Sequence, residues 1–113
     1  MDDCLFCKIA AGELPATVVE RTEDVIAIRD VNPQAPSHVL VMPVAHHATI
    51  ADLLDKDVAL ATRVMETASA LGRRAGAANG FRLVVNTGSD GGQTVDHVHV
   101  HVLAGRHMSW PPG

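Results

Sequence analysis

The chain of 113 residues is long enough for a domain with a buried core, and its 47% hydrophobic and 19% charged residues are typical of a globular protein. Its formal net charge of −4 at pH 7 argues against a nucleic-acid-binding surface, which needs clustered lysine and arginine. No apolar run approaches the ~20 residues of a membrane span, and the start is acidic where a signal peptide would be basic. We therefore expect a cytoplasmic protein that binds neither nucleic acid nor membrane.

The first half of the chain predicts a short helix, a hairpin and a buried strand. Residues 4–11 can form the helix, which a glycine and a proline close. Two short strand-like runs at 18–21 and 25–29 flank a Thr-Glu-Asp turn, which indicates an antiparallel hairpin. After a proline-containing loop, the continuous apolar run 39–42 is typical of a strand that is buried on both faces.

The second half predicts one long helix and two more strands. Asp52 or Asp55 can cap the start of the helix, and a glycine-containing segment ends it. Apolar residues at spacings of three and four predict one stripe that packs into the core: Leu54, Val58, Ala61, Met65, Ala68, Leu71 and Ala75. Strand-forming residues follow at 81–86 and 97–103, joined by a glycine-rich loop, and the proline-containing tail 105–113 continues no regular element.

This order of elements predicts an α+β fold in a single domain over residues 1–113. We expect an antiparallel sheet of about five strands, with the long helix on one face and a short N-terminal helix. The last two strands are expected to form a second hairpin.

Three histidines alternate with valines in the segment 97–103. Because successive side chains of a strand point to opposite faces, His97, His99 and His101 share one face and the valines share the other. The valine face can pack into a core, so the histidine face must line something polar. The residues alone leave two functions open: a nucleophilic imidazole that attacks phosphorus, or three ligands of a catalytic zinc. Three exposed histidines without a role are the third alternative.

The glycine-rich loop before this strand can bind an anion. Gly88, Gly91 and Gly92 allow backbone conformations in which N–H groups converge on a phosphate. The loop would bring those groups, the Thr94 hydroxyl and the His99 imidazole to one end of the sheet. The alternative is a hairpin loop whose glycines only permit the turn.

A Cys-x-x-Cys pair near the start of the chain indicates a metal site. Cys4 and Cys7 have the spacing of half a zinc site, which needs two more ligands. His97 and one of the adjacent His46 and His47 would complete a closed Cys2His2 site, which is structural rather than catalytic. Free thiols and a redox-active pair are the alternatives.

The chain resembles the histidine-triad (HIT) family over essentially its whole length. Residues 97–103 match the family signature His-φ-His-φ-His-φ-φ, in which φ is apolar, at every position. Residues 6–9 resemble the family's opening, and residues 30–38 resemble its proline-rich loop. The run 84–93 and the ending 105–113 resemble the family more distinctively, and the ending looks like the Hint branch, whose members are nucleoside phosphoramidases.

The resemblance implies a reaction and a role for each site residue. His99 would attack the α-phosphorus of a purine nucleoside phosphoramidate such as an AMP-amine, expel the amine and form a nucleotidyl-histidine that water hydrolyses. His101 would contact the phosphate, and His38 would support the triad. The implied nucleotide contacts are Gly92, Gln93 and Thr94 to phosphate and leaving group, Asp30 to the ribose hydroxyls, Val31 beside the base, and Asn86 facing the nucleotide.

The resemblance also implies a metal and a partner. Bacterial HIT proteins with a similar cysteine pair can hold zinc, and the matching ligand set is Cys4, Cys7, His46 and His97. His47 is the alternative to His46. Family members are homodimers whose sheets join across the interface, and the Trp110 tail would reach toward the partner's active site. No organic cofactor is implied.

Two rival functions stay open beside this leading one. The first is a zinc-dependent hydrolase that uses the triad as ligands. The second is a nucleotide-binding or protein-interaction module with weak activity. Thr94 also departs from the Hint pattern, because a serine is usual there and the extra methyl can crowd the leaving group.

Overall fold

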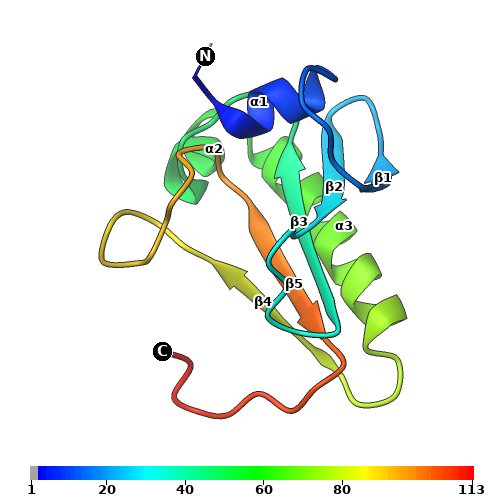
Figure 1. Cartoon of the computed structure of the whole chain (residues 1–113). Coiled ribbons are helices and arrows are strands. Elements are labelled where there is room, and N and C mark those ends of the chain that lie inside the picture. Colours follow the sequence, from blue (N-terminus) through cyan, green and yellow to red (C-terminus); the bar gives the residue numbers. More distant parts are fainter. Residues whose placement is uncertain (1–2) are drawn as a thin grey trace.

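The computed structural model describes residues 3–113, which form a five-stranded antiparallel sheet and three helices (Figure 1). In chain order the elements are α1 (Leu5–Ala10), β1 (Val18–Arg21), β2 (Val25–Arg29), β3 (Ser37–Pro43), α2 (Ile50–Lys56), α3 (Val58–Ala75), β4 (Phe81–Val85) and β5 (Val100–Ala104). The strand order β1-β2-β3-β5-β4 puts β3 at the centre and leaves β1 and β4 at the edges. The predicted α+β class, the antiparallel sheet and both hairpins are confirmed. Within the described range no helix has the length and apolar character needed to cross a bilayer.

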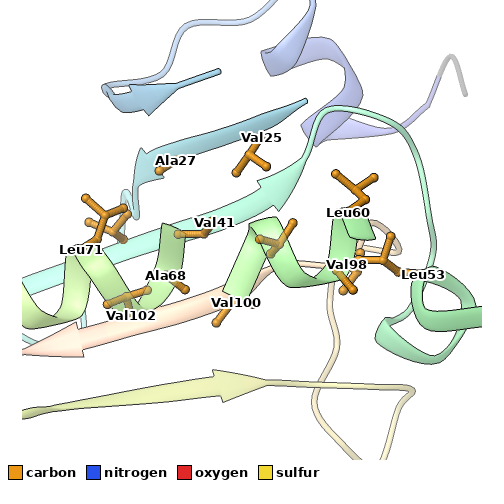
Figure 2. Packing of buried hydrophobic residues seen from close by; sticks show 13 residues of the cluster. Val25, Ala27, Val41, Leu53, Leu60, Ala68, Leu71, Val98, Val100 and Val102 are labelled. Carbon is orange, nitrogen blue, oxygen red and sulfur yellow. The ribbon is translucent and has the colours of Figure 1, made fainter. Parts of the chain in front are cut away.

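Strand β3 is buried on both faces, as its continuous apolar run predicted. Val39 and Val41 belong to one hydrophobic cluster, and Leu40 and Met42 belong to another on the opposite face of the sheet. On the first face, the long helix α3 packs against valines and alanines of β2, β3 and β5 (Figure 2). On the second face, α1 contributes Phe6 to the smaller cluster. The rest of this second face is where the candidate site lies.

The single long helix expected from the sequence is in fact two helices. α2 and α3 meet at Asp57, whose carboxylate accepts the backbone N–H of Leu60 at 3.0 Å and so caps α3. Thr49 caps α2, so the expected caps Asp52 and Asp55 are wrong. The physical reason is that Asp52 already lies in the first turn, where its own N–H needs the partner that the Thr49 hydroxyl supplies.

The buried stripe of these helices also differs from the predicted one. Ala61, Ala68 and Leu71 are buried as expected. Four predicted core residues are instead exposed: Leu54, Val58, Met65 and Ala75. Since the break at Asp57 changes the phase of the helical pattern, Leu53 replaces Leu54 in the core of α2.

Strand β5 pairs with its neighbours only from Val100 onward, later than the expected start at His97. Before that point the chain leaves the sheet, and the backbone N–H of Val98 donates to the carbonyl of His47 at 2.8 Å. The alternation of side chains nevertheless continues, because Val98 packs with the other valines against α3. His97 and His99 therefore sit on an irregular segment, not on a regular strand.

Candidate functional site

Four candidate metal ligands meet where α1 lies over the end of the sheet (Figure 1). They are Cys4, Cys7, His46 and His97, and their ligand atoms all lie within 4.8 Å of one another. Cys4 caps α1 and Cys7 lies in its first turn, whereas His46 follows β3 and His97 precedes β5. The Cys4 Sγ lies 3.2 Å from His97 Nδ1, and the Cys7 Sγ lies 3.4 Å from His46 Nδ1. Two thiols and two imidazoles are the donor set of a closed tetrahedral zinc site.

The ring of His97 is oriented by the backbone for this role. Its Nε2 lies 2.8 Å from the carbonyl oxygen of Pro43, and because a carbonyl can only accept, Nε2 carries the proton. Nδ1 therefore presents its lone pair to the sulfurs of Cys4 and Cys7. Burial lowers the pKa of His97 and so favours the neutral ring that binds a metal. Ligand histidines commonly donate their second N–H to a carbonyl in this way.

The two cysteines are free thiols, and they must lose their protons to bind a metal ion. Burial raises the pKa of Cys7 to about 11, and hydrogen bonding and charge from Cys4 add to the shift. Since only a thiolate ligates a metal, binding here must release protons. The cluster contains His46 and not the alternative His47.

His99 is held with one ring nitrogen free. The residue is 6% exposed, and its Nδ1 lies 2.8 Å from the carbonyl oxygen of His97. Nδ1 must therefore be the protonated nitrogen, so Nε2 keeps its lone pair. The ring of Phe6 meets His99 edge-on, with the ring centroids 5.0 Å apart and an interplanar angle of 81°. A neutral imidazole fixed in this tautomer is a competent nucleophile.

His101 has the opposite tautomer, because a chain of hydrogen bonds fixes it. The backbone N–H of Gln34 donates to His38 Nδ1 at 3.0 Å, so the neutral His38 carries its proton on Nε2. That nitrogen donates to His101 Nδ1 at 2.9 Å, which leaves the His101 proton on Nε2. Asp30 Oδ2 lies 3.4 Å from His38 Nε2. Burial lowers the pKa of His101 to about 4, with the nearby His99 and His38 adding to the shift, so the ring is a neutral donor at pH 7.

The remaining predicted nucleotide contacts lie around this face of the sheet. In the sheet, His101 of β5 pairs with Leu40 of β3 on one side and with Val84 of β4 on the other. These three residues belong to the sheet face opposite α3. Asn86 is half-buried directly after β4. Val31 lies beyond β2 and is 99% exposed. Asp30, His38, His99 and His101 are thus brought together, whereas the side chain of Val31 is in solvent.

Several donors of the glycine-rich loop are used in hydrogen bonds within the protein. The backbone N–H groups of Gly92 and Gln93 donate to carbonyls within the loop. The Gln93 side chain accepts the N–H of Gly88 at 3.0 Å and donates to the Ala48 carbonyl at 2.7 Å. Thr94 is exposed and lines a pocket of about 450 Å³ beside the cysteine–histidine cluster. The N–H groups of Gly92 and Gln93 are therefore engaged within the protein, whereas the exposed Thr94 hydroxyl faces this pocket.

Phe6, Gln34 and Pro43 have roles in the site that the sequence does not reveal. Gln34 and Pro43 act through a backbone N–H and a backbone carbonyl, which every suitable residue type would offer. Phe6 contacts two histidines that lie far along the chain. No pattern of residue types marks such contacts before the chain is folded.

The fold and the site together define a small α+β protein with a histidine-triad centre beside a cysteine–histidine cluster. Residues 11–108 match the model of the HIT domain family, and the chain belongs to this family. The resemblance inferred from the sequence is thereby confirmed.

Three relatives place the chain within this family. A HIT family hydrolase from Legionella pneumophila has a similar structure, with a TM-score of 0.92, 50% identity, and 98% of this chain and 100% of that chain covered. A 14 kDa zinc-binding protein of Zea mays is 40% identical, over 96% of this chain and 87% of that protein. The adenylylsulfatase HINT1 of Arabidopsis thaliana is 39% identical, over 96% of this chain and 76% of that protein.

Proposed function

We propose that this protein is a nucleotide hydrolase that cleaves the P–N bond of purine nucleoside phosphoramidates such as AMP-amines. The observation that carries the proposal is the hydrogen bond from His99 Nδ1 to the His97 carbonyl, which leaves Nε2 free to attack phosphorus. Relatives described as a HIT family hydrolase and an adenylylsulfatase support hydrolysis at the phosphorus of an adenylyl group.

The reaction proceeds in two displacements at the α-phosphorus. In the first, the lone pair of His99 Nε2 forms a bond to phosphorus, the P–N bond breaks, and the amine leaves with the bonding pair and takes a proton from water, which leaves hydroxide. In the second, water attacks phosphorus, the bond to Nε2 breaks with its electron pair returning to the ring, AMP leaves, and the proton released from the attacking water neutralises the hydroxide of the first step. The Nε2–H of His101 donates to a phosphate oxygen, where it stabilises the charge that develops.

The substrate lies along the sheet face that carries the triad. Asp30 takes the ribose hydroxyls, and the base covers the exposed side chain of Val31. Asn86 faces the nucleotide from the end of β4. Thr94 donates its hydroxyl beside the leaving group, and Gly92 and Gln93 shape the loop that presents it.

The Arabidopsis relative favours a second candidate substrate, adenylyl sulfate. Attack by His99 is the same, but the bond that breaks is P–O and sulfate leaves in place of the amine. Comparing kcat/KM for an AMP phosphoramidate and adenylyl sulfate on one enzyme preparation ranks the two candidates.

Mass spectrometry tests the covalent mechanism. The parent protein, mixed with an AMP phosphoramidate and quenched in alkaline denaturant, should gain the mass of one adenylyl group on the His99 peptide. His99→Ala should form no adduct and lose roughly four orders of magnitude or more in kcat. Asp55→Ala, which changes an exposed residue of α2, is the control and should match the parent. Hydrolysis by His99→Ala near the parent rate would refute the mechanism.

We infer that Cys4, Cys7, His46 and His97 hold a structural zinc ion. Their donor set and proximity fit zinc, and the maize relative is a zinc-binding protein. The ion would tie α1 to the ends of β3 and β5. The rival, a catalytic zinc on the triad, fits the geometry less well, because the Nδ1 atoms of His97 and His101 face different partners.

We also propose that the protein is a homodimer whose sheets join along β4. This strand is an edge of the sheet, so its outer backbone groups can pair with a second copy. Beside it runs a groove of about 870 Å³ whose apolar lining includes Ile50, Leu54, Ala61, Met65, Leu83 and Val85. The tail that carries the exposed Trp110 is held by Arg82, which donates to the Ser109 carbonyl at 3.1 Å. In the dimer this tail would reach toward the active site of the partner subunit.

A further inference from the structure

The cysteine–histidine cluster and the nucleophile are joined through two residues. His97 gives its ring to the cluster and its carbonyl oxygen to the Nδ1–H of His99. Phe6, which lies between Cys4 and Cys7 in the chain, meets both rings edge-on. Its ring centroid lies 5.9 Å from that of His97 and 5.0 Å from that of His99, with an interplanar angle of 81° to each.

We infer that Phe6 and His97 are positioning residues, which make the orientation of the His99 ring depend on the cysteine–histidine cluster. The kinetic part of this inference rests on the proposed function, because it concerns attack by His99. The cluster then serves the reaction and not only the stability of the fold.

The short helix α1 couples the position of the Phe6 ring to the positions of the two cysteines in the cluster. A helix of 6 residues is too short to be stable alone, so its position depends on what its side chains contact. Phe6 and Ala10 are its buried residues, and Cys4 and Cys7 join it to the cluster. Any movement of the two cysteines therefore moves the Phe6 ring that lies between them.

The consequence for His99 follows from its single anchoring hydrogen bond. One side of the ring is fixed by the His97 carbonyl, and the Phe6 ring limits rotation of the imidazole. Without that ring, His99 can turn away from the carbonyl, and the Nε2–H tautomer becomes populated. That tautomer has no lone pair on the attacking nitrogen, so the rate of attack falls.

Phe6→Leu tests the inference, because it keeps an apolar side chain but removes the aromatic ring. The matched control is Ile9→Ala, on the same helix and packed against the same hydrophobic cluster. Ring ¹⁵N chemical shifts report the His99 tautomer, elemental analysis reports zinc per chain, and single-turnover kinetics report the rate constant of adenylyl-histidine formation. Phe6→Tyr, which retains the ring, should preserve the parent tautomer.

We expect Phe6→Leu to keep the parent zinc content and the parent Kd for AMP, but to show both His99 tautomers and about tenfold slower adenylylation. Ile9→Ala should lower Tm while it keeps the parent tautomer and rate constant. Should Phe6→Leu fail to fold, Phe6→Met serves in its place.

Two results would overturn the inference: a single Nδ1–H tautomer in Phe6→Leu at the parent rate, or an equal tautomer shift in Ile9→Ala. The tautomer measurement needs no substrate. A parent protein that forms no adenylyl-histidine would therefore refute the proposed function, while the tautomers still decide the role of Phe6.

Discussion

The Nε2 of His38 donates to the Nδ1 of His101 at 2.9 Å, and the backbone N–H of Gln34 fixes the direction of that hydrogen bond. As a result, the outward nitrogen of His101 is a donor. The neighbouring ring of His99, with its centroid 5.0 Å away, has the opposite tautomer and offers a lone pair. Two identical side chains thus have complementary roles, because a backbone carbonyl holds His99 and the His38 side chain holds His101.

His38→Phe should lower kcat by roughly 100-fold with little change in KM. The substitution keeps a buried ring but removes the proton donor that fixes the tautomer of His101. Steady-state hydrolysis of an AMP phosphoramidate measures the effect, and Asp55→Ala is the control at an exposed residue of α2. A His38→Phe enzyme with the parent kcat would show that this hydrogen-bond chain is dispensable.

Cys7→Ser should lose the bound zinc and lower Tm by at least about 5 °C, because metal binding is coupled to folding. Elemental analysis and thermal unfolding measure the two effects. His47→Ala should keep the zinc, since His47 lies outside the cluster. A catalytic zinc would give a different result: chelation would abolish turnover without changing Tm, and added zinc would restore it.

The free energy of unfolding should fall as the pH drops from about 6.5 to about 4. The pKa of His101 is lowered from 6.5 to about 4 by burial, so the unfolded chain binds a proton in this range that the folded chain does not. The contribution of His101 is complete above pH 6.5 and is lost toward pH 4. Urea unfolding of the parent and of His101→Gln, at matched zinc content, isolates this contribution. Equal pH dependence in the two proteins would contradict the assignment.

Met65→Glu should convert the proposed dimer into monomers. Met65 is 37% exposed and lines the groove beside β4, so a carboxylate there would lose its hydration in the dimer. Analytical ultracentrifugation measures the mass in solution. Val58→Glu is the matched control, because Val58 is 62% exposed and does not line the groove. A monomeric parent protein would refute the interface.

Local patterns in the sequence predicted much of the fold. The bounds of β1 and β2 were predicted correctly, because a turn between two short apolar runs specifies a hairpin locally. The helical region was predicted less well. Spacing alone indicated one continuous stripe, whereas the side chain of Asp57 ends one helix and begins another. Such a break depends on a few hydrogen bonds, which a periodicity of apolar residues does not register.

The residue types of the site can be read from the sequence: a row of three histidines with valines between them, a glycine-rich loop and a Cys-x-x-Cys pair. Their division between a metal cluster and a nucleophilic centre follows from the folded chain. Folding joined Cys4 to His97 across a separation of 93 residues and put His46 rather than His47 in the cluster. It also gave His99 and His101 opposite tautomers. The physical reason is that these assignments depend on groups that reach the rings only after folding: side chains from distant parts of the chain, and backbone carbonyls and N–H groups that nearly every residue type carries.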